Sequence, residues 1–106
     1  MDFKELADNL ELEENEFLEL VTLFVDTGYS DLNKLQSAIE DGDSEKAKWV
    51  AHSVKGASVN LGLTEIFELT KRIEMNIQEN DLYGATGAVQ RIKEELDRLA
   101  KALPKK

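Results

Sequence analysis

A chain of 106 residues, of which 42% are hydrophobic and 33% are charged, has the size and composition of a single globular domain. Its 22 acidic and 13 basic residues give a net charge of −9, which repels phosphate backbones and anionic lipids, so we expect neither nucleic acid nor membrane as a partner. The chain has no cysteine and therefore no disulfide, thiolate or iron–sulfur chemistry, and it has no apolar run of about 20 residues that would span a bilayer. Residues 1–5 show neither the basic nor the apolar stretch of a leader peptide, so we expect a cytoplasmic protein.

Apolar residues recur at helical spacing along the chain, which predicts an all-α protein. The segment Asp2-x-x-Glu5 has the pattern of a capping box, so it predicts a short first helix that covers one end of the fold. A second helix carries the apolar residues Phe17, Leu20, Val21, Phe24 and Val25. Gly28 predicts a stop or a kink after it, and a third element over 29–39 is expected to end at Gly42.

The next two helices are predicted from their capping residues. Asp43 is expected to cap a helix that runs to about Leu61, and Gly62 closes it because glycine readily takes the left-handed conformation that follows a helix end. Thr64 is expected to cap the following helix, which ends near 80–81. The inner side of this helix is predicted to carry Ile66, Leu69, Ile73 and Ile77.

The last helix is predicted to end before Pro104, which cannot continue it. Its apolar face comprises Ala85, Val89, Ile92, Leu96, Leu99 and Leu103. Connections this short favour antiparallel neighbours. We therefore expect one domain over residues 1–106, an antiparallel up-down four-helix bundle with a short extra N-terminal helix.

The helix between Asp43 and Gly62 contains His52, the only histidine in the chain. At about 100° per residue, one stripe of this helix comprises Ala47, Val50, Ala51, Val54, Ser58 and Leu61, which must face the core. His52 lies roughly 160° from the centre of the stripe, so it is expected to face water. Gly56 and Val59 fall on the same outward line, and Lys48 and Lys55 flank it.

These outward residues suit a site that carries a phosphoryl group. Neutral imidazole is a good nucleophile near pH 7, and flanking lysines can pair with phosphoryl oxygens, each contributing about 1 kcal/mol or less at an exposed site. A glycine in the middle of a helix lowers its stability by roughly 1 kcal/mol relative to alanine, so the presence of Gly56 calls for an explanation. We infer that it lets the active site of a partner approach the imidazole of His52, while Val59 offers an apolar contact.

Residues 51–62, AHSVKGASVNLG, resemble the signature of the histidine phosphotransfer (HPt) family. The family pattern is a histidine, Lys-Gly at i+3 and i+4, and a second glycine at i+10. The matching positions here are His52, Lys55, Gly56 and Gly62. The resemblance extends over about residues 12–103 and implies the four-helix bundle of the family. Two departures do not touch the chemistry, since Val54 replaces the usual leucine and Leu63 stands where a small residue is common.

The resemblance also implies a function. His52 would accept a phosphoryl group from the aspartyl phosphate of a receiver domain and pass it to another receiver in a two-component phosphorelay. The receivers, of response regulators or hybrid histidine kinases, would supply the metal and most catalytic groups. The chain itself would be a monomeric phosphoryl carrier with no cofactor and no kinase activity of its own. Which receivers are the partners, in which direction the phosphoryl group flows, and whether the chain stands alone or belongs to a larger hybrid kinase stay open.

Several alternatives concern single residues or the whole site. Lys48 could be an ordinary surface lysine, and Trp49 could be either a docking aromatic or a partly buried residue of the bundle. The hydroxyl of Ser58 is expected to bond a carbonyl one turn back rather than a phosphate, and Gly62 is structural. One histidine cannot supply a di-iron site, which needs two. The alternative that remains for the whole chain is a helical adaptor whose exposed patch binds a partner without chemistry.

Overall fold

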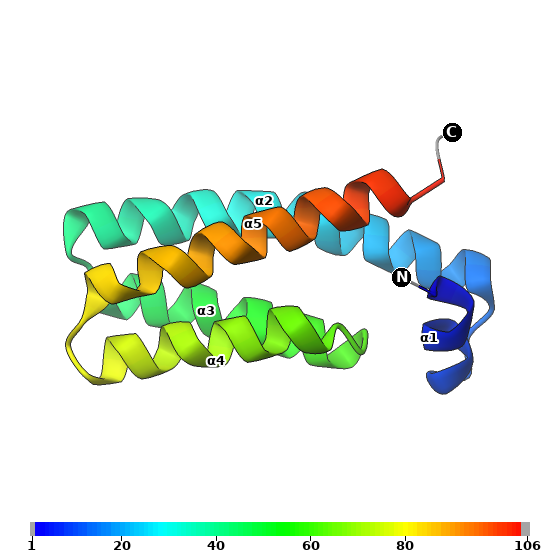
Figure 1. Cartoon of the computed structure of the whole chain (residues 1–106), viewed down its shortest axis with the longest axis horizontal. Helices are drawn as coiled ribbons and strands as arrows, with labels where there is room; N and C mark the ends of the chain where they lie inside the picture. Colours follow the sequence, from blue (N-terminus) through cyan, green and yellow to red (C-terminus); the bar gives the residue numbers. More distant parts are fainter. Residues whose placement is uncertain (1, 105–106) are drawn as a thin grey trace.

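The computed structural model describes residues 2–104 and shows an all-helical bundle. The helices are α1 (Phe3–Asn9), α2 (Glu14–Asp41), α3 (Ser44–Asn60), α4 (Thr64–Gln78) and α5 (Thr86–Ala102), with a 3₁₀ turn, η1 (Leu82–Ala85), before α5. Helices α2 and α5 run side by side above the pair α3 and α4, and α1 lies at one end beside the first turns of α2 (Figure 1). The predicted four-helix bundle with a short extra N-terminal helix is confirmed.

The predicted break at Gly28 is wrong, because α2 continues through it as one helix of 28 residues. The helix ends only at Gly42, whose φ of 69° is left-handed. Gly28 is buried against α5, and a Cβ built on it would lie 3.0 Å from Cδ1 of Leu96. The glycine therefore serves close packing of two helices, which explains its presence without any stop or kink.

Helix α1 begins with one half of the predicted capping box, since the Asp2 carboxylate accepts a hydrogen bond from the backbone N–H of Glu5 at 3.1 Å. Its buried residue is Ala7, while Phe3 and Leu6 are half-buried against the core. The ring of Phe3 lies 6.3 Å from that of Phe17 on α2, centroid to centroid. Helix α1 thus covers the part of α2 that extends beyond the other helices, as expected for an end cap.

The ends of α3 follow the prediction closely. Asp43 accepts a hydrogen bond from the backbone N–H of Lys46 at 3.1 Å, which satisfies one free donor of the first turn. After the helix, Gly62 has a φ of 73°, and the N–H of Leu63 reaches back to the carbonyl of Ser58 at 2.9 Å. This pattern is a Schellman C-cap, in which glycine avoids the strain that a side chain would create.

Two predicted boundaries around α4 and α5 need correction. Thr64 is the first residue of α4 and not its cap, because Leu63 holds the N-cap position and no side chain bonds the free donors there. Ala85 belongs to η1 and not to α5, although it is buried as expected. Helix α5 ends at Ala102, two residues before Pro104.

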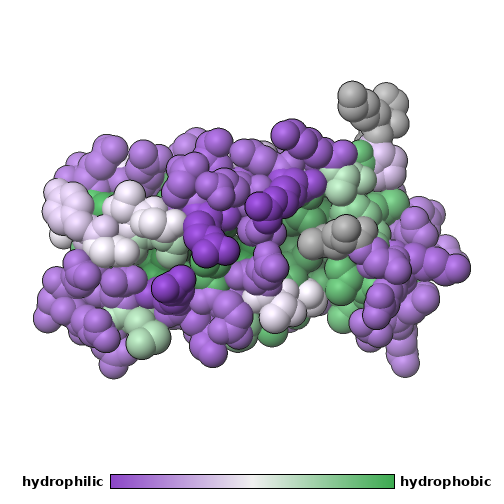
Figure 2. Space-filling model, viewed as in Figure 1, coloured by the Kyte–Doolittle hydropathy of each residue, from purple (hydrophilic) through white to green (hydrophobic). Residues whose placement is uncertain are grey.

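The core lies along the bundle axis, where apolar side chains of all four long helices meet. Its fully buried large residues include Phe17, Leu35, Ile73, Ile92 and Leu96. Hydrophilic residues cover most of the face seen in Figure 2, and hydrophobic atoms show mainly in the recesses between helices and toward the end where α1 lies. Within residues 2–104, no helix is both long and apolar enough to cross a membrane.

Candidate functional site

The outer face of α3 carries His52 as predicted. The side chains of Ala47, Ala51, Val54 and Ser58 are buried on the opposite side, and Val50 is partly buried. This arrangement fixes the rotation of the helix, so the His52 side chain is 70% exposed. The imidazole therefore projects into solvent from the middle of a rigid helix, where a partner protein can reach it.

A residue of α4 that the sequence did not reveal lies beside this histidine. The Oε2 atom of Glu74 is 3.9 Å from Nδ1 of His52, and its Oε1 atom is 2.7 Å from Nζ of Lys55. The carboxylate of Glu74 thus joins the lysine and the histidine across the α3–α4 contact. The neighbouring Ile73 faces the core, which places Glu74 at the edge of α4 that meets α3.

The position of Glu74 makes the two ring nitrogens of His52 unequal. A carboxylate near Nδ1 favours the tautomer that carries its proton at Nδ1, because the proton is attracted to the negative charge. The lone pair is then at Nε2, on the side of the ring that faces away from Glu74. A nucleophile is therefore presented outward, and a partial positive charge that develops on the ring would lie next to the Glu74 carboxylate.

The two predicted phosphate-stabilising lysines are placed differently. Lys55 is only partly exposed, and its amino group is held by Glu74, so it must turn away from that carboxylate to pair with a phosphoryl group. Lys48 is exposed one turn before His52, and among residues 2–104 it forms no ion pair. Both amino groups lie on helix positions next to the imidazole, within reach of an anion bound there.

The two predicted docking residues also lie on the outer face. A Cβ built on Gly56 would meet no heavy atom within 4 Å, so the bundle itself does not require a glycine there. Val59 is 53% exposed one turn further along the helix. The open space above Gly56 and the exposed apolar Val59 agree with a surface that a partner covers.

Two open questions about α3 are answered by the structure. Trp49 is not a partly buried residue of the bundle, since it is 75% exposed. Ser58 is fully buried, and its hydroxyl donates a hydrogen bond to the carbonyl of Lys55 at 2.8 Å, as predicted. Gly62 is the structural C-cap residue, so it supports the helix and does not touch the imidazole.

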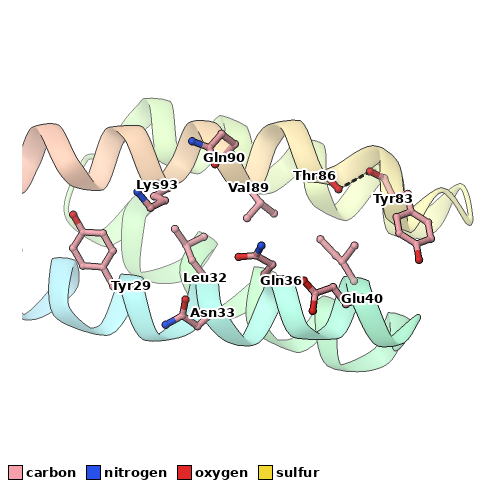
Figure 3. A pocket seen from close by; sticks show the side chains of 11 residues that line it. Tyr29, Leu32, Asn33, Gln36, Glu40, Tyr83, Thr86, Val89, Gln90 and Lys93 are labelled. Atoms are coloured by element: carbon pink, nitrogen blue, oxygen red, sulfur yellow. Dashed lines mark hydrogen bonds between the residues drawn. The ribbon is translucent and has the colours of Figure 1, made fainter.

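A hollow of about 430 Å³ lies between α2 and α5, away from His52. Figure 3 shows that its lining side chains come from these two helices and from η1, with Tyr29 and Lys93 at one end and Tyr83 at the other. The Tyr29 hydroxyl donates a hydrogen bond to Asp97 at 2.5 Å, which raises the pKa of Tyr29 to about 12 and lowers the pKa of Asp97. This hollow contains no histidine, and the bond from Tyr29 to Asp97 joins α2 to α5 beside it.

Comparison with known proteins gives one match. The family model described as the Hpt domain matches residues 19–102. These residues include most of α2 and all of α3, α4 and α5 up to its last residue, and therefore His52, Lys55 and Glu74. No curated protein matches the chain, and no solved structure does.

Proposed function

The chain belongs to the Hpt domain family, whose function is histidine phosphotransfer in a phosphorelay, and we propose that His52 is the residue that carries the phosphoryl group. The observation that carries this proposal is that the only histidine of the chain stands 70% exposed on the outer face of α3. A phosphoryl carrier needs such a projecting nucleophile, because the receiver domain surrounds it during transfer.

The chemical step follows from the geometry of the ring. The Nε2 lone pair attacks phosphorus of the aspartyl phosphate, an N–P bond forms, and the P–O bond to the aspartyl carboxylate breaks, with the electron pair leaving on that carboxylate. The proton stays at Nδ1, so the imidazole becomes positively charged during the step. Glu74, whose Oε2 lies 3.9 Å from Nδ1, offsets part of this charge. The reverse sequence returns the phosphoryl group to a second receiver.

Lys48 and Lys55 flank His52 on α3, while Glu45 and Glu74 also lie beside it. From Lys46 to Asn60, α3 contains three lysines and no acidic residue, whereas the chain as a whole has a net charge of −9. The positive stretch faces the anionic phosphoryl group. Since exposed pairs contribute only about 1 kcal/mol or less each, Lys48 and Lys55 hold the group without trapping it. A carrier must also release the phosphoryl group, so weak binding by the lysines suits this role.

The receiver is proposed to cover the outer face of α3 beyond His52. Gly56 leaves space for its approach, and Val59 offers an apolar contact. A shallow hollow of about 260 Å³ lies on the side toward α2, lined among others by Leu23, Ser53 and Ala57, and Leu23 is 64% exposed. A transient interface at or below about 1,200 Å² can be formed from these residues.

The test of the proposed function is the His52→Gln variant. Incubation of the wild-type chain with a phosphorylated receiver should place an acid-labile, alkali-stable label on it, and His52→Gln should abolish the label. Because the side chain is exposed, helicity and melting temperature should stay nearly unchanged. A labelled variant would contradict the assignment. A wild-type chain that binds the receiver without ever being labelled would favour the helical adaptor instead.

Three further properties belong to the proposal. We expect no label from ATP alone, which incubation with radiolabelled ATP tests. Each bundle presents one histidine, so we expect a monomer, and light scattering coupled to gel filtration measures that. A cytoplasmic location stays a prediction that cell fractionation tests.

A further inference from the structure

Trp49 is the most exposed of the large hydrophobic residues in the described part of the chain, at 75%. Its indole ring is open to solvent, so a partner that covers it would gain the stabilisation that burial of the ring gives. It is also the only tryptophan of the chain. Trp49 lies on α3 one turn before His52, so a protein that reaches His52 also meets the indole ring.

A hollow of about 320 Å³ lies directly beside the imidazole, and it is lined by Glu45, Lys48, Trp49 and His52. Its lining combines the indole ring with charged residues, whose carbon chains can also contact an apolar side chain. The nucleophile and the exposed aromatic ring therefore share one depression of the surface. No residue of another helix belongs to its lining.

Phosphoryl transfer forces a receiver to cover this depression. The phosphorus must come within about 3–3.5 Å of Nε2 in line with the bond that breaks. Residues three positions apart on a helix have Cβ atoms only about 5–6 Å apart, so Trp49 lies inside the area that the receiver occupies while it contacts His52. Transfer and burial of the indole thus happen in the same complex.

We propose that Trp49 is the apolar anchor of receiver docking. The inference rests on the proposed function of His52. The hollow beside Trp49 takes an apolar side chain of the receiver from the surface next to its aspartyl phosphate, while Lys48 at the rim faces the phosphoryl oxygens. Tryptophan is among the residues that most often dominate the binding energy of protein interfaces, and it does so when a partner excludes water from it.

The experiment compares two phosphoryl donors. The first is the receiver domain that transfers fastest to the wild-type chain in a panel of purified, phosphorylated receivers. The second is phosphoramidate, a small donor whose P–N bond breaks as the N–P bond to Nε2 forms, with ammonia as the leaving group. Only the first donor needs a docking surface, so the comparison separates docking from the chemistry of His52.

For Trp49→Ala we expect KM for the phosphorylated receiver to rise by about thirtyfold, with kcat nearly unchanged. The rate of labelling by phosphoramidate should equal that of the wild-type chain. Trp49→Phe should recover part of the lost affinity, because a smaller ring still fills part of the hollow. Tyr83→Ala is the matched control, since Tyr83 is also an exposed aromatic, at 71%, but lines the hollow between α2 and α5. Its KM and kcat should not change.

Emission of the single tryptophan gives a second measurement. Addition of a receiver without tryptophan should shift or quench the emission as the indole is buried, and the change should saturate with the affinity found from KM. An unchanged KM in Trp49→Ala, or equal losses with both donors, would overturn the anchoring role and leave His52 as the carrier. Absence of label on the wild-type chain with either donor would instead overturn the proposed function itself.

Discussion

Two glycines in the middle of helices, Gly28 and Gly56, stand in opposite surroundings. Gly28 lies in the contact between α2 and α5, where an added Cβ would come 3.0 Å from Cδ1 of Leu96. Gly56 lies on the outer face of α3, where an added Cβ would meet nothing within 4 Å. Each glycine costs roughly 1 kcal/mol of helix stability relative to alanine. Packing within the bundle accounts for the first cost, whereas it does not account for the second.

The same contrast separates the two surfaces around these glycines. The contact of α2 with α5 borders a hollow of about 430 Å³, yet its polar groups, such as Tyr29 and Asp97, bond one another across the helices. The outer face of α3 presents an imidazole and an indole to solvent instead. The hollow between α2 and α5 therefore does not mark the candidate site, because neither the imidazole of His52 nor the indole of Trp49 lines it. The predictions below test whether changes on one surface affect transfer and changes on the other affect stability.

The largest effect is expected from Gly56→Gln. A side chain above Gly56 would displace the receiver, and a misplacement of about 1 Å can slow a reaction about a hundredfold. Transfer from a phosphorylated receiver should fall by about that factor, while labelling by phosphoramidate stays unchanged. Thermal unfolding should show equal or slightly greater stability, by up to about 1 kcal/mol.

Gly87→Gln is the matched control for this variant. Gly87 is also a helical glycine with no heavy atom within 4 Å of an added Cβ, but it lies on α5. The Gly87→Gln variant should accept the phosphoryl group at the wild-type rate. Equal rates for Gly56→Gln and the wild-type chain would contradict the argument that the receiver approaches over Gly56.

Gly28→Ala is expected to lower stability and leave transfer unchanged, which is the opposite of the outcome for Gly56→Gln. The added Cβ forces Leu96 to shift, and overpacking of this kind costs about 1–3 kcal/mol, partly offset by the roughly 1 kcal/mol that alanine gains in a helix. We expect a net loss of about 1 kcal/mol in chemical denaturation, with the transfer rate unchanged. On a Leu96→Ala background the same substitution should cost nothing more. If Gly28→Ala lowered the stability of the Leu96→Ala background further, the steric explanation would be contradicted.

A smaller effect is expected from Glu74→Ala. In the proposed step the carboxylate would offset charge at Nδ1 of His52 across 3.9 Å at a partly exposed site, where such interactions contribute about 1 kcal/mol or less. Transfer should slow by about fivefold at most. Nitrogen chemical shifts of the imidazole should show less of the tautomer protonated at Nδ1. Glu68→Ala serves as control, because Glu68 lies on the same helix but pairs with Lys71 at 3.9 Å. If Glu74→Ala and Glu68→Ala change the transfer rate and the imidazole shifts equally, Glu74 has no specific role.

The smallest effect is expected on folding stability at high pH, through the ionisation of Tyr29. Its pKa is raised to about 12 in the folded chain, above the ordinary value of 10.0, first by its hydrogen bond to Asp97 and then by burial. Stability from this group is therefore fully present below pH 10 and is lost as the pH rises through about 12. Tyrosinate absorbance should show a late titration step that Tyr29→Phe removes. A wild-type chain without such a step would show that the bond to Asp97 is absent in solution.

Local patterns in the sequence predicted most of the features that position His52 on the outer face of α3. The spacing of Ala47, Ala51 and Val54 marks the buried side of α3, and the helix turns by about 100° per residue. The position of His52 opposite that side follows directly. Capping by Asp43 and Gly62 was also predictable, because both act on backbone groups only a few residues away.

The expected break at Gly28 was wrong for a physical reason. A glycine that ends a helix and a glycine that lets another helix approach have the same local signal. Only the position of Leu96 on α5 distinguishes them, and that residue is far away in the sequence. Trp49 was ambiguous for a related reason, since only the packing of the other helices decides whether an aromatic residue beside the outward patch is covered.

The sequence by itself thus determined the four-helix bundle, the exposure of His52 and the residues beside it on α3. The tertiary structure alone decided that Glu74 joins the site. Arg72 and Glu74 lie about 100° to either side of the buried Ile73, and the handedness of the bundle selects which of them faces α3. In the structure Glu74 meets His52, while Arg72 lines a hollow between α4 and α5. Periodicity gives the angle of a residue about its helix axis, but only the packing of helices gives the neighbour found at that angle.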